Sequence, residues 1–213
     1  MASLEAFKSE IITGGLVMDP EGVHHEFVSG MHGQKLDFDK IPEDSELYRD
    51  WVGVNVDFIR NTYTQIPGAL IGVANGTNRL ARDVGAVMFG ETTALPSAKD
   101  PENSKRLYLP EYTHKFLEIM QPKLAIVLED VGTTGSNSVQ VAEAALDAGA
   151  EYVEVVLTWQ RRAQLERLRK AKIPYRSIIE EALPTFTPGP GGTCATDPNG
   201  FCARGWEFIA REK

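Results

Sequence analysis

Mostly apolar runs alternate along the chain with amphipathic stretches, and this alternation predicts the elements of the fold. Runs of the kind that form buried strands stand at 69–73, 86–89, 124–128 and 152–158. Stretches with apolar residues every three or four positions predict helices at 3–13, 44–64, 79–83, 111–120, 136–148 and 161–170. Strands that alternate with helices predict an α/β fold with a central, mostly parallel sheet flanked by helices.

The remaining segments are less regular. Short strands are expected at 16–17 and 23–28, and an edge strand at 175–179. Residues 92–110 have little periodicity and many polar side chains, which predicts a long mobile excursion.

The length of 213 residues fits a single domain spanning 1–213. Within it we expect an N-terminal cap segment over 1–64, a core α/β sheet over 65–180 and an irregular C-terminal tail over 181–213.

The most informative pattern lies at 124–138. An apolar run is followed by two adjacent acids, Glu129 and Asp130, and then by a turn rich in glycine and hydroxyl groups. Backbone N–H groups at the start of a helix suit a phosphate, whereas carboxylates suit sugar hydroxyls or a hydrated divalent cation. Together they predict a site for a phosphorylated ribose. The alternative is an ordinary strand-to-helix turn capped by Thr134 or Ser136.

Composition narrows the class of protein. The chain has 22 Lys and Arg against 30 Asp and Glu, a net charge of −8, and its basic run at 161–170 is mixed with Glu166. This balance argues against nucleic acid as a partner. No signal-peptide pattern and no run of membrane-spanning length is present, which predicts a cytoplasmic location.

Both cysteines, Cys194 and Cys202, stand in the tail. Free thiols, a disulfide between them and a metal site remain open.

The pattern at 124–138 resembles the signature of type I phosphoribosyltransferases, which use phosphoribosyl pyrophosphate (PRPP). Most of the chain, 3–188, resembles orotate phosphoribosyltransferases within that family. The resemblance implies that Glu129 and Asp130 hold the ribose hydroxyls and act in catalysis. It also implies PRPP binding by the loop residues Val131, Gly132, Thr133, Thr134, Gly135, Ser136 and Asn137. Two departures are Glu129, where Asp is commoner, and Ser136, where a second Gly is usual.

A second loop, 72–78, follows a strand and opens a helix, so it is expected at the same sheet edge. By resemblance, Ala74, Asn75 and Gly76 bind the pyrophosphate of PRPP. Orotate enzymes often carry a Lys here, and this chain has only Arg79 nearby. The alternative is a tight turn that uses Asn and Gly.

Contacts to the base are implied for residues from three segments. Arg161 stands at a strand end where orotate enzymes pair an Arg with the substrate carboxylate, and a guanidinium suits a carboxylate bidentately. The alternative is a helix-start arginine in solvent. Lys35, Asp37 and Phe38 lie in a segment, 29–40, that resembles a hairpin over the base, or is a solvated turn. Thr133 completes the implied base contacts.

The excursion stands where the family has its flexible catalytic loop. Lys99 and Lys105 are the implied catalytic cations and Arg106 an implied PRPP contact, but the family pattern Lys-x-x-Lys-x-His-Gly is absent. The alternative is an ordinary solvated loop.

The resemblance implies Mg²⁺ as cofactor, held through PRPP rather than by direct protein ligands, with Asp130 contacting it through water. It also implies a homodimer, with PRPP and a nucleobase as small-molecule partners and no membrane partner. The favoured function is transfer of phosphoribosyl to orotate. The alternatives are transfer to another base, such as a purine, and a non-catalytic PRPP or nucleotide sensor.

Overall fold

The computed structural model describes residues 3–15, 17, 23–26, 32–74, 76–88, 92–103, 105–161, 165–183, 185–186, 201–204 and 207–209. The chain divides into two compact units, a core unit over Tyr48–Glu181 and a terminal unit made of Ala2–Leu47 and Ala182–Lys213. Each is described by itself below.

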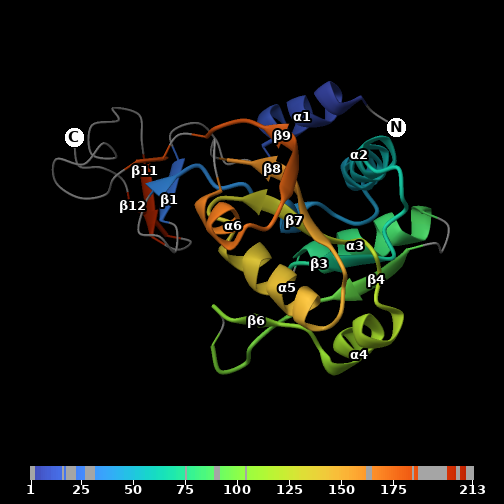
Figure 1. The fold of residues 1–213 in the computed structure, drawn as a ribbon. Coiled ribbons are helices and arrows are strands. Elements are labelled where there is room, and N and C mark those ends of the chain that lie inside the picture. The colour runs from blue at the N-terminus through green and yellow to red at the C-terminus, as the bar shows by residue number, and fades with distance from the viewer. Residues whose placement is uncertain are drawn as a thin grey trace. The chain divides into compact units, whose positions relative to one another are not determined.

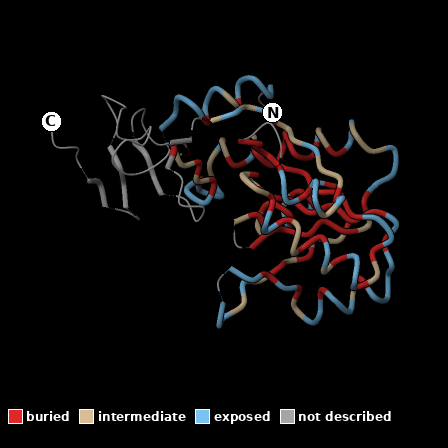
Figure 2. Tube along the Cα trace, turned by 60° about the vertical axis from the view of Figure 1, so that its left-hand side comes forward, coloured by how far each residue is buried: buried red, intermediate tan, exposed pale blue. Residues whose placement is uncertain are grey.

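A five-stranded sheet forms the centre of the core unit (Figure 1). Its strands are β4 (Thr93–Pro96), β3 (Ala69–Gly72), β7 (Ala125–Gly132), β8 (Val153–Gln160) and β9 (Tyr175–Glu180), in that spatial order. Every neighbouring pair is parallel. β3, β7 and β8 lie inside the sheet and are almost entirely buried (Figure 2), which explains their apolar runs. The predicted α/β fold with a mostly parallel sheet is confirmed.

Helices cover both faces of this sheet. They are α2 (Glu46–Thr62), α3 (Gly76–Val87), α4 (Glu111–Met120), α5 (Ser136–Asp147) and α6 (Glu166–Ala171). Alternate strand residues, such as Val127 and Val155, join the buried apolar cluster of α4, α5 and α6. Thr158 faces the other side, where its Oγ1 accepts a 2.8 Å hydrogen bond from Nε1 of Trp51 on α2. α3 lies on this second side, because Tyr48 of α2 donates to Asp83 of α3 at 2.7 Å.

The chain reverses its direction of travel across the sheet between β3 and β7. From β3 it runs through α3 to β4 at one edge, and from β7 it runs through α5 to β8 toward the other edge. Ligands of open α/β sheets bind beyond the carboxyl ends of the strands at such a switch point. The topology alone therefore directs attention to the loops that follow β3 and β7.

Two predictions within the core unit are wrong. The strand expected at 86–89 begins within α3, which continues to Val87, and residues 89–91 lie outside the described part. The expected excursion at 92–110 starts with β4, an edge strand of the sheet. It continues as an antiparallel hairpin of β5 (Ala98–Lys99) and β6 (Leu107–Tyr108).

The terminal unit holds helix α1 (Leu4–Thr13), the 3₁₀ helix η1 (Phe38–Lys40) and a second five-stranded sheet. The strands are β10 (Thr185–Phe186), β2 (His32–Gly33), β1 (Val23–Glu26), β11 (Phe201–Arg204) and β12 (Glu207–Ile209), in spatial order. The prediction of an irregular tail is wrong, because three tail strands pair in this sheet and β11 runs parallel to β1.

The expected cap boundary at residue 64 also differs from the division at residue 47. Most of α2 belongs to the core unit, since Trp51 and Ile59 are buried there. The assignment of 1–213 as one phosphoribosyltransferase domain stays a prediction. The state of the cysteines also stays a prediction, because Cys194 lies outside the described residues.

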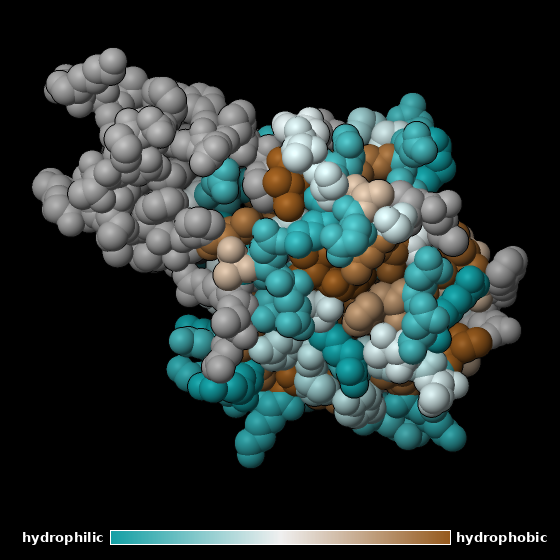
Figure 3. Space-filling view, turned by 90° about the horizontal axis from the view of Figure 1, so that it is seen from above, coloured by the Kyte–Doolittle hydropathy of each residue, from teal (hydrophilic) through white to brown (hydrophobic). Residues whose placement is uncertain are grey.

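Where the face in Figure 3 is coloured, hydrophilic residues surround apolar ones that gather near its centre. Within the described ranges, no helix is both long enough and apolar enough to cross a membrane.

Candidate functional site at the carboxyl edge of the sheet

Two helices begin at the carboxyl edge, one after each central strand. α3 starts at Gly76, four residues after β3, and α5 starts at Ser136, four residues after β7. β3 and β7 are hydrogen-bonded neighbours, so both helix N-termini serve one edge. The first backbone N–H groups of a helix have no partner inside it and carry partial positive charge. This edge therefore offers two adjacent groups of donors to an anion.

Glycines stand at both ends of the loop between β7 and α5, where a Cβ would crowd a neighbouring leucine. Gly135 has φ +77°, and a Cβ there would lie 2.8 Å from Cγ of Leu168. A Cβ on Gly132 would lie 2.7 Å from a methyl group of Leu157. Packing at Gly132 and the left-handed conformation of Gly135 thus fix the backbone that enters α5.

Hydroxyl groups line the outer side of this loop. Oγ1 of Thr134 lies 3.2 Å from Oγ of Ser136. The backbone carbonyl of Thr134 accepts a 3.2 Å bond from the backbone N–H of Arg167. Ser136 and Asn137 are exposed in the first turn of α5. The loop predicted to bind a phosphate therefore presents hydroxyls and helical N–H groups to solvent, on a backbone tied to α6.

The two adjacent acids occupy different environments. Successive residues of a strand point to opposite faces, and Glu129 points to the α5 face, where its carboxylate accepts a hydrogen bond from Ser138. Burial, reinforced by the charge of Asp130, raises the pKa of Glu129 well above its usual range. Asp130 is partly exposed, and its Oδ1 accepts a 2.7 Å bond from the N–H of Val131. Asp130 is thus the acid that can reach a ligand, whereas the burial of Glu129 argues against direct contact with ribose hydroxyls.

The loop after β3 is braced from within the sheet. Oγ1 of Thr77 donates to the carbonyls of Val73 at 2.6 Å and Leu128 at 2.9 Å. The N–H of Ala74 donates to Oγ of Ser97 at 2.9 Å. Ser97 was not anticipated from the sequence, because its partner stands 23 residues away. Of the predicted pyrophosphate contacts, Ala74 and Gly76 lie at this edge, and Asn75 lies outside the described residues.

Arg161 follows β8 directly and is only 3% exposed. Its backbone N–H donates to the carbonyl of Gly132 at 3.0 Å, which places it beside the loop that enters α5. The expected helix over 161–170 begins only at Glu166, so the alternative of a helix-start arginine in solvent is wrong. Contact of Arg161 with a substrate carboxylate stays a prediction.

The remaining predicted cations lie on the β5–β6 hairpin. Lys99 and Lys105 are exposed, and the Arg106 side chain is 71% exposed with a loose 3.9 Å ion pair to Asp100. The hairpin contacts α5 through Gln140, whose Oε1 accepts a 2.9 Å bond from the N–H of Leu107. Lys105 and Arg106 therefore belong to a segment tied to the helix that follows the β7 loop.

The predicted base contacts at 35–38 lie in the terminal unit. Lys35 and Asp37 form a 2.7 Å ion pair. Phe38 is fully buried, which argues against its contact with a base. Thr133, the other predicted base contact, is partly exposed in the β7 loop. For Lys35, Asp37 and Thr133 the contact with a base stays a prediction.

The predicted Mg²⁺ concerns the acids of this edge. Within the described ranges, no three His, Cys, Asp or Glu residues are grouped closely enough to hold a metal ion. Asp130 supplies one partly exposed carboxylate, which fits a contact through water to a cation carried by phosphate oxygens.

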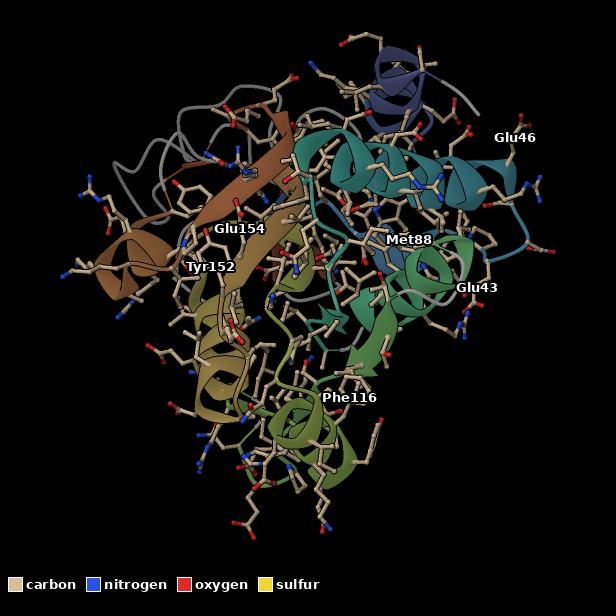
Figure 4. All side chains as sticks on the ribbon, turned by 45° about the vertical axis from the view of Figure 1, so that its right-hand side comes forward. Glu43, Glu46, Met88, Phe116, Tyr152 and Glu154 are labelled. Atoms are coloured by element: carbon tan, nitrogen blue, oxygen red, sulfur yellow. The ribbon has the colours of Figure 1, made fainter. Side chains whose placement is uncertain are left out.

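A separate cavity of about 480 Å³ lies at the opposite, amino edge of the sheet. Tyr152 and Glu154 of the β8 end (Figure 4) line it with Arg169, Lys172 and Arg176. The Glu154 side chain is 5% exposed and pairs with Arg176 at 2.7 Å. None of the predicted site residues lines this cavity.

Comparison with known proteins supports the fold. No family model and no curated protein matches the chain. Among solved structures, orotate phosphoribosyltransferase from Aeropyrum pernix is similar at 18% identity and a TM-score of 0.56, over 84% of this chain and 94% of that one. Leishmania donovani UMP synthase aligns at 15% identity and a TM-score of 0.60, over 84% of this chain and 36% of that one.

A third similar structure, adenine phosphoribosyltransferase from Saccharomyces cerevisiae in complex with adenine, has 14% identity and a TM-score of 0.56. The alignment covers 82% of this chain and 99% of the yeast chain. The chain thus has the fold of type I phosphoribosyltransferases, and the similar structures include enzymes named for a pyrimidine and for a purine.

Proposed function

We propose that the protein transfers phosphoribosyl from PRPP to a nucleobase in a Mg²⁺-dependent reaction, with orotate as the favoured base. The products with orotate would be orotidine 5′-phosphate and pyrophosphate. The proposal rests on one observation above all. At the switch point of a phosphoribosyltransferase fold, Asp130 is followed by a glycine-constrained, hydroxyl-rich loop that opens α5.

Each part of this edge would have one task. Residues 132–137 would bind the 5-phosphate through the hydroxyls and the first N–H groups of α5. Asp130 would hold ribose hydroxyls and face the positive charge that develops on the sugar as pyrophosphate leaves C1. Ala74 and Gly76, at the start of α3, would contact the pyrophosphate. Mg²⁺, when bound with PRPP, would neutralise the leaving group, with Asp130 as its neighbour through water.

Arg161 supports the choice of orotate. The backbone of Arg161 lies beside the phosphate loop, and its guanidinium is a group that would pair bidentately with a carboxylate on the base. Adenine carries no carboxylate for such a pair. A location in the cytoplasm is also proposed, as expected from the sequence, and assembly as a homodimer is proposed from the family resemblance alone.

The missing Lys-x-x-Lys-x-His-Gly pattern supports two alternatives. The site would either accept another base, such as a purine, or bind PRPP or a nucleotide without turnover. Lys99, Lys105 and Arg106 on the hairpin are the cations available to replace the family pattern.

Release of pyrophosphate from PRPP and Mg²⁺ tests the proposal, with orotate compared against a panel of free purine and pyrimidine bases. Release with orotate and with no other base of the panel supports the proposed reaction. Release with another base moves the assignment to that base. PRPP binding without release from any base would favour the sensor, and absence of both would exclude the proposal.

A further inference from the structure

The β5–β6 hairpin needs support from outside itself. Each of its strands has only two residues, and an isolated two-stranded hairpin is marginally stable in water. Leu107, at its base, is buried in the core cluster, but the turn residues 101–103, 105 and 106 are exposed. Some further contact must fix the direction in which the turn and its cations project.

Gln140 of α5 provides this contact through both ends of its side-chain amide. Its Oε1 accepts a 2.9 Å bond from the N–H of Leu107, and its Nε2 donates to the carbonyl of Lys105 at 3.2 Å. Between these two groups lies Arg106, whose own N–H and carbonyl bond inward to Asn103 and Asp100 at 2.8 and 2.9 Å. Gln140 therefore binds the outward edge of the hairpin in the way that a neighbouring strand would.

The same amide is anchored to the start of α5. Nε2 of Gln140 also donates to the carbonyl of Ser136 at 3.3 Å, and Ser136 is the first residue of the helix. Gln140 stands one helical turn after it, a rise of about 5.4 Å. The hairpin segment that carries Lys105 and Arg106 is consequently fixed beside the first turn of the helix that follows the β7 loop.

Cations in this place have a clear use if the proposed function holds. The chain carries a net charge of −8, so a substrate with a phosphate and a pyrophosphate group gains from cations held near its binding loop. Lys105 is exposed, and Arg106 pairs loosely with Asp100 at 3.9 Å, so both side chains can turn toward a ligand.

We propose that Gln140 is a positioning residue that latches the β5–β6 hairpin to α5 and so holds Lys105 and Arg106 beside the phosphate-binding loop. The inference rests on the proposed function. The chain lacks the family pattern Lys-x-x-Lys-x-His-Gly, and Gln140 would place Lys105 and Arg106 in its stead. Gln140 itself lies outside the phosphate-binding loop.

The test compares Gln140→Met, which keeps the side-chain length but removes both bonds, with wild type. Glu143→Met is the matched control, since Glu143 is exposed on the same helix. We expect hydrogen exchange at the Leu107 amide to become about 10-fold faster in Gln140→Met only. The KM for PRPP is expected to rise about 10-fold while the KM for the base is unchanged, because the base does not depend on these cations.

A second variant tests whether the effect passes through the cations. In a Lys105→Ala/Arg106→Ala background, Gln140→Met should leave the KM for PRPP unchanged, since the groups it positions are gone. An equal rise in both backgrounds would overturn the inference, as would unaltered exchange at Leu107.

Failure of the proposed function is a separate result. It would appear as a wild-type protein that neither binds PRPP nor releases pyrophosphate, and the positioning role would be excluded with it. The Leu107 exchange needs no substrate, so it reports on the latch itself in either case.

Discussion

The two edges of the parallel sheet place positive charge by different means. At the amino edge, Arg169, Lys172 and Arg176 gather around a cavity of about 480 Å³. At the carboxyl edge the first donors are backbone N–H groups, because α3 and α5 both begin there. Their N–H groups and hydroxyls are held by packing, whereas the cations of the amino edge stand on long flexible side chains.

The comparison shows that the number of cations is a poor guide to an anion site. Glu154 lies among the amino-edge cations and pairs with Arg176, which neutralises part of the positive charge. α6 ends there at Ala171, so the dipole of that helix presents its negative end. At the carboxyl edge the helix dipoles and the N–H and hydroxyl donors act in the same direction, and the conformation of Gly135 fixes the loop before a ligand arrives.

Replacement of Gly135 by alanine should have the largest effect. A Cβ at φ +77° lies 2.8 Å from Leu168, so the β7 loop must move and several phosphate donors move with it. We expect kcat/KM for PRPP to fall on the order of 1000-fold, measured by pyrophosphate release. Gly149→Ala is the matched control, because Gly149 has φ +109° but lies at the amino edge. Both variants should lose stability by about 1–2 kcal/mol in urea unfolding. Equal losses of activity would contradict the difference between the edges.

Removal of one carboxylate from each edge comes next. Asp130→Asn keeps the size of the side chain but removes the charge beneath the sugar, so kcat/KM should fall about 100-fold with the fold intact. Glu154→Gln, at the amino edge of the neighbouring strand, should lower stability through loss of its 2.7 Å pair with Arg176 and leave turnover unchanged. Steady-state kinetics with circular dichroism checks both. Full activity of Asp130→Asn would remove the ribose role from this residue.

The next comparison is between substitutions of Arg161 and Arg176, one at each edge. Arg161→Met should raise the KM for orotate about 10-fold or more, because a charged hydrogen bond to the base is lost, and change the KM for PRPP much less. Arg176→Met, on β9 at the amino edge, should change neither constant. Equal effects of Arg161→Met on both substrates would exclude the assigned pairing with a carboxylate.

The smallest expected effect is on the pH dependence of stability, through Glu129, the buried one of the two neighbouring acids. Burial raises the pKa of Glu129, so between its unfolded value, about 4.3, and that raised value the folded state binds more protons than the unfolded state. The stabilising contribution of Glu129 is therefore complete below the unfolded pKa and is lost as the pH rises through the folded pKa. Glu129→Gln cannot titrate, so its stability relative to wild type should increase with pH, by at most about 1.4 kcal/mol per pH unit.

Urea unfolding at several pH values measures this difference, with Glu143→Gln as the exposed control on α5. Curves for wild type and Glu129→Gln that stay parallel across the range would show that Glu129 does not carry its proton into the folded state.

The central part of the fold could be predicted because local patterns and tertiary packing agree there. Five consecutive apolar residues at 124–128 are followed by a glycine-rich turn and an amphipathic stretch, and in this context they predict a buried strand. The strand expected at 86–89 failed because Ala86 and Val87 continue α3, with Val87 45% exposed and Met88 buried at the helix end. β4 carries little apolar signal and ends in Pro96, which is tolerated because the strand lies at the sheet edge.

The geometry of the candidate site was only partly predictable for similar reasons. The spacing of glycines and hydroxyls predicts a loop between a strand and a helix, and the structure has that loop between β7 and α5. The same pattern does not distinguish Glu129 from Asp130, which the strand places on opposite faces. Ser97 and Gln140 were missed because their partners stand far away along the chain. The position of β4 beside β3 brings Ser97 to the carboxyl edge, and the β5–β6 hairpin gives Gln140 its partners. The sequence pattern indicated neither the strand order nor the hairpin.

The most direct test of the central claim is the pattern of amide hydrogen exchange with and without PRPP and Mg²⁺. The account predicts protection in 72–78 and 131–140, at the carboxyl edge, and no change at the amino-edge cavity around 152–154 and 172–176. Protection confined to the amino-edge cavity, with exchange in the β7 loop unaltered, would contradict it.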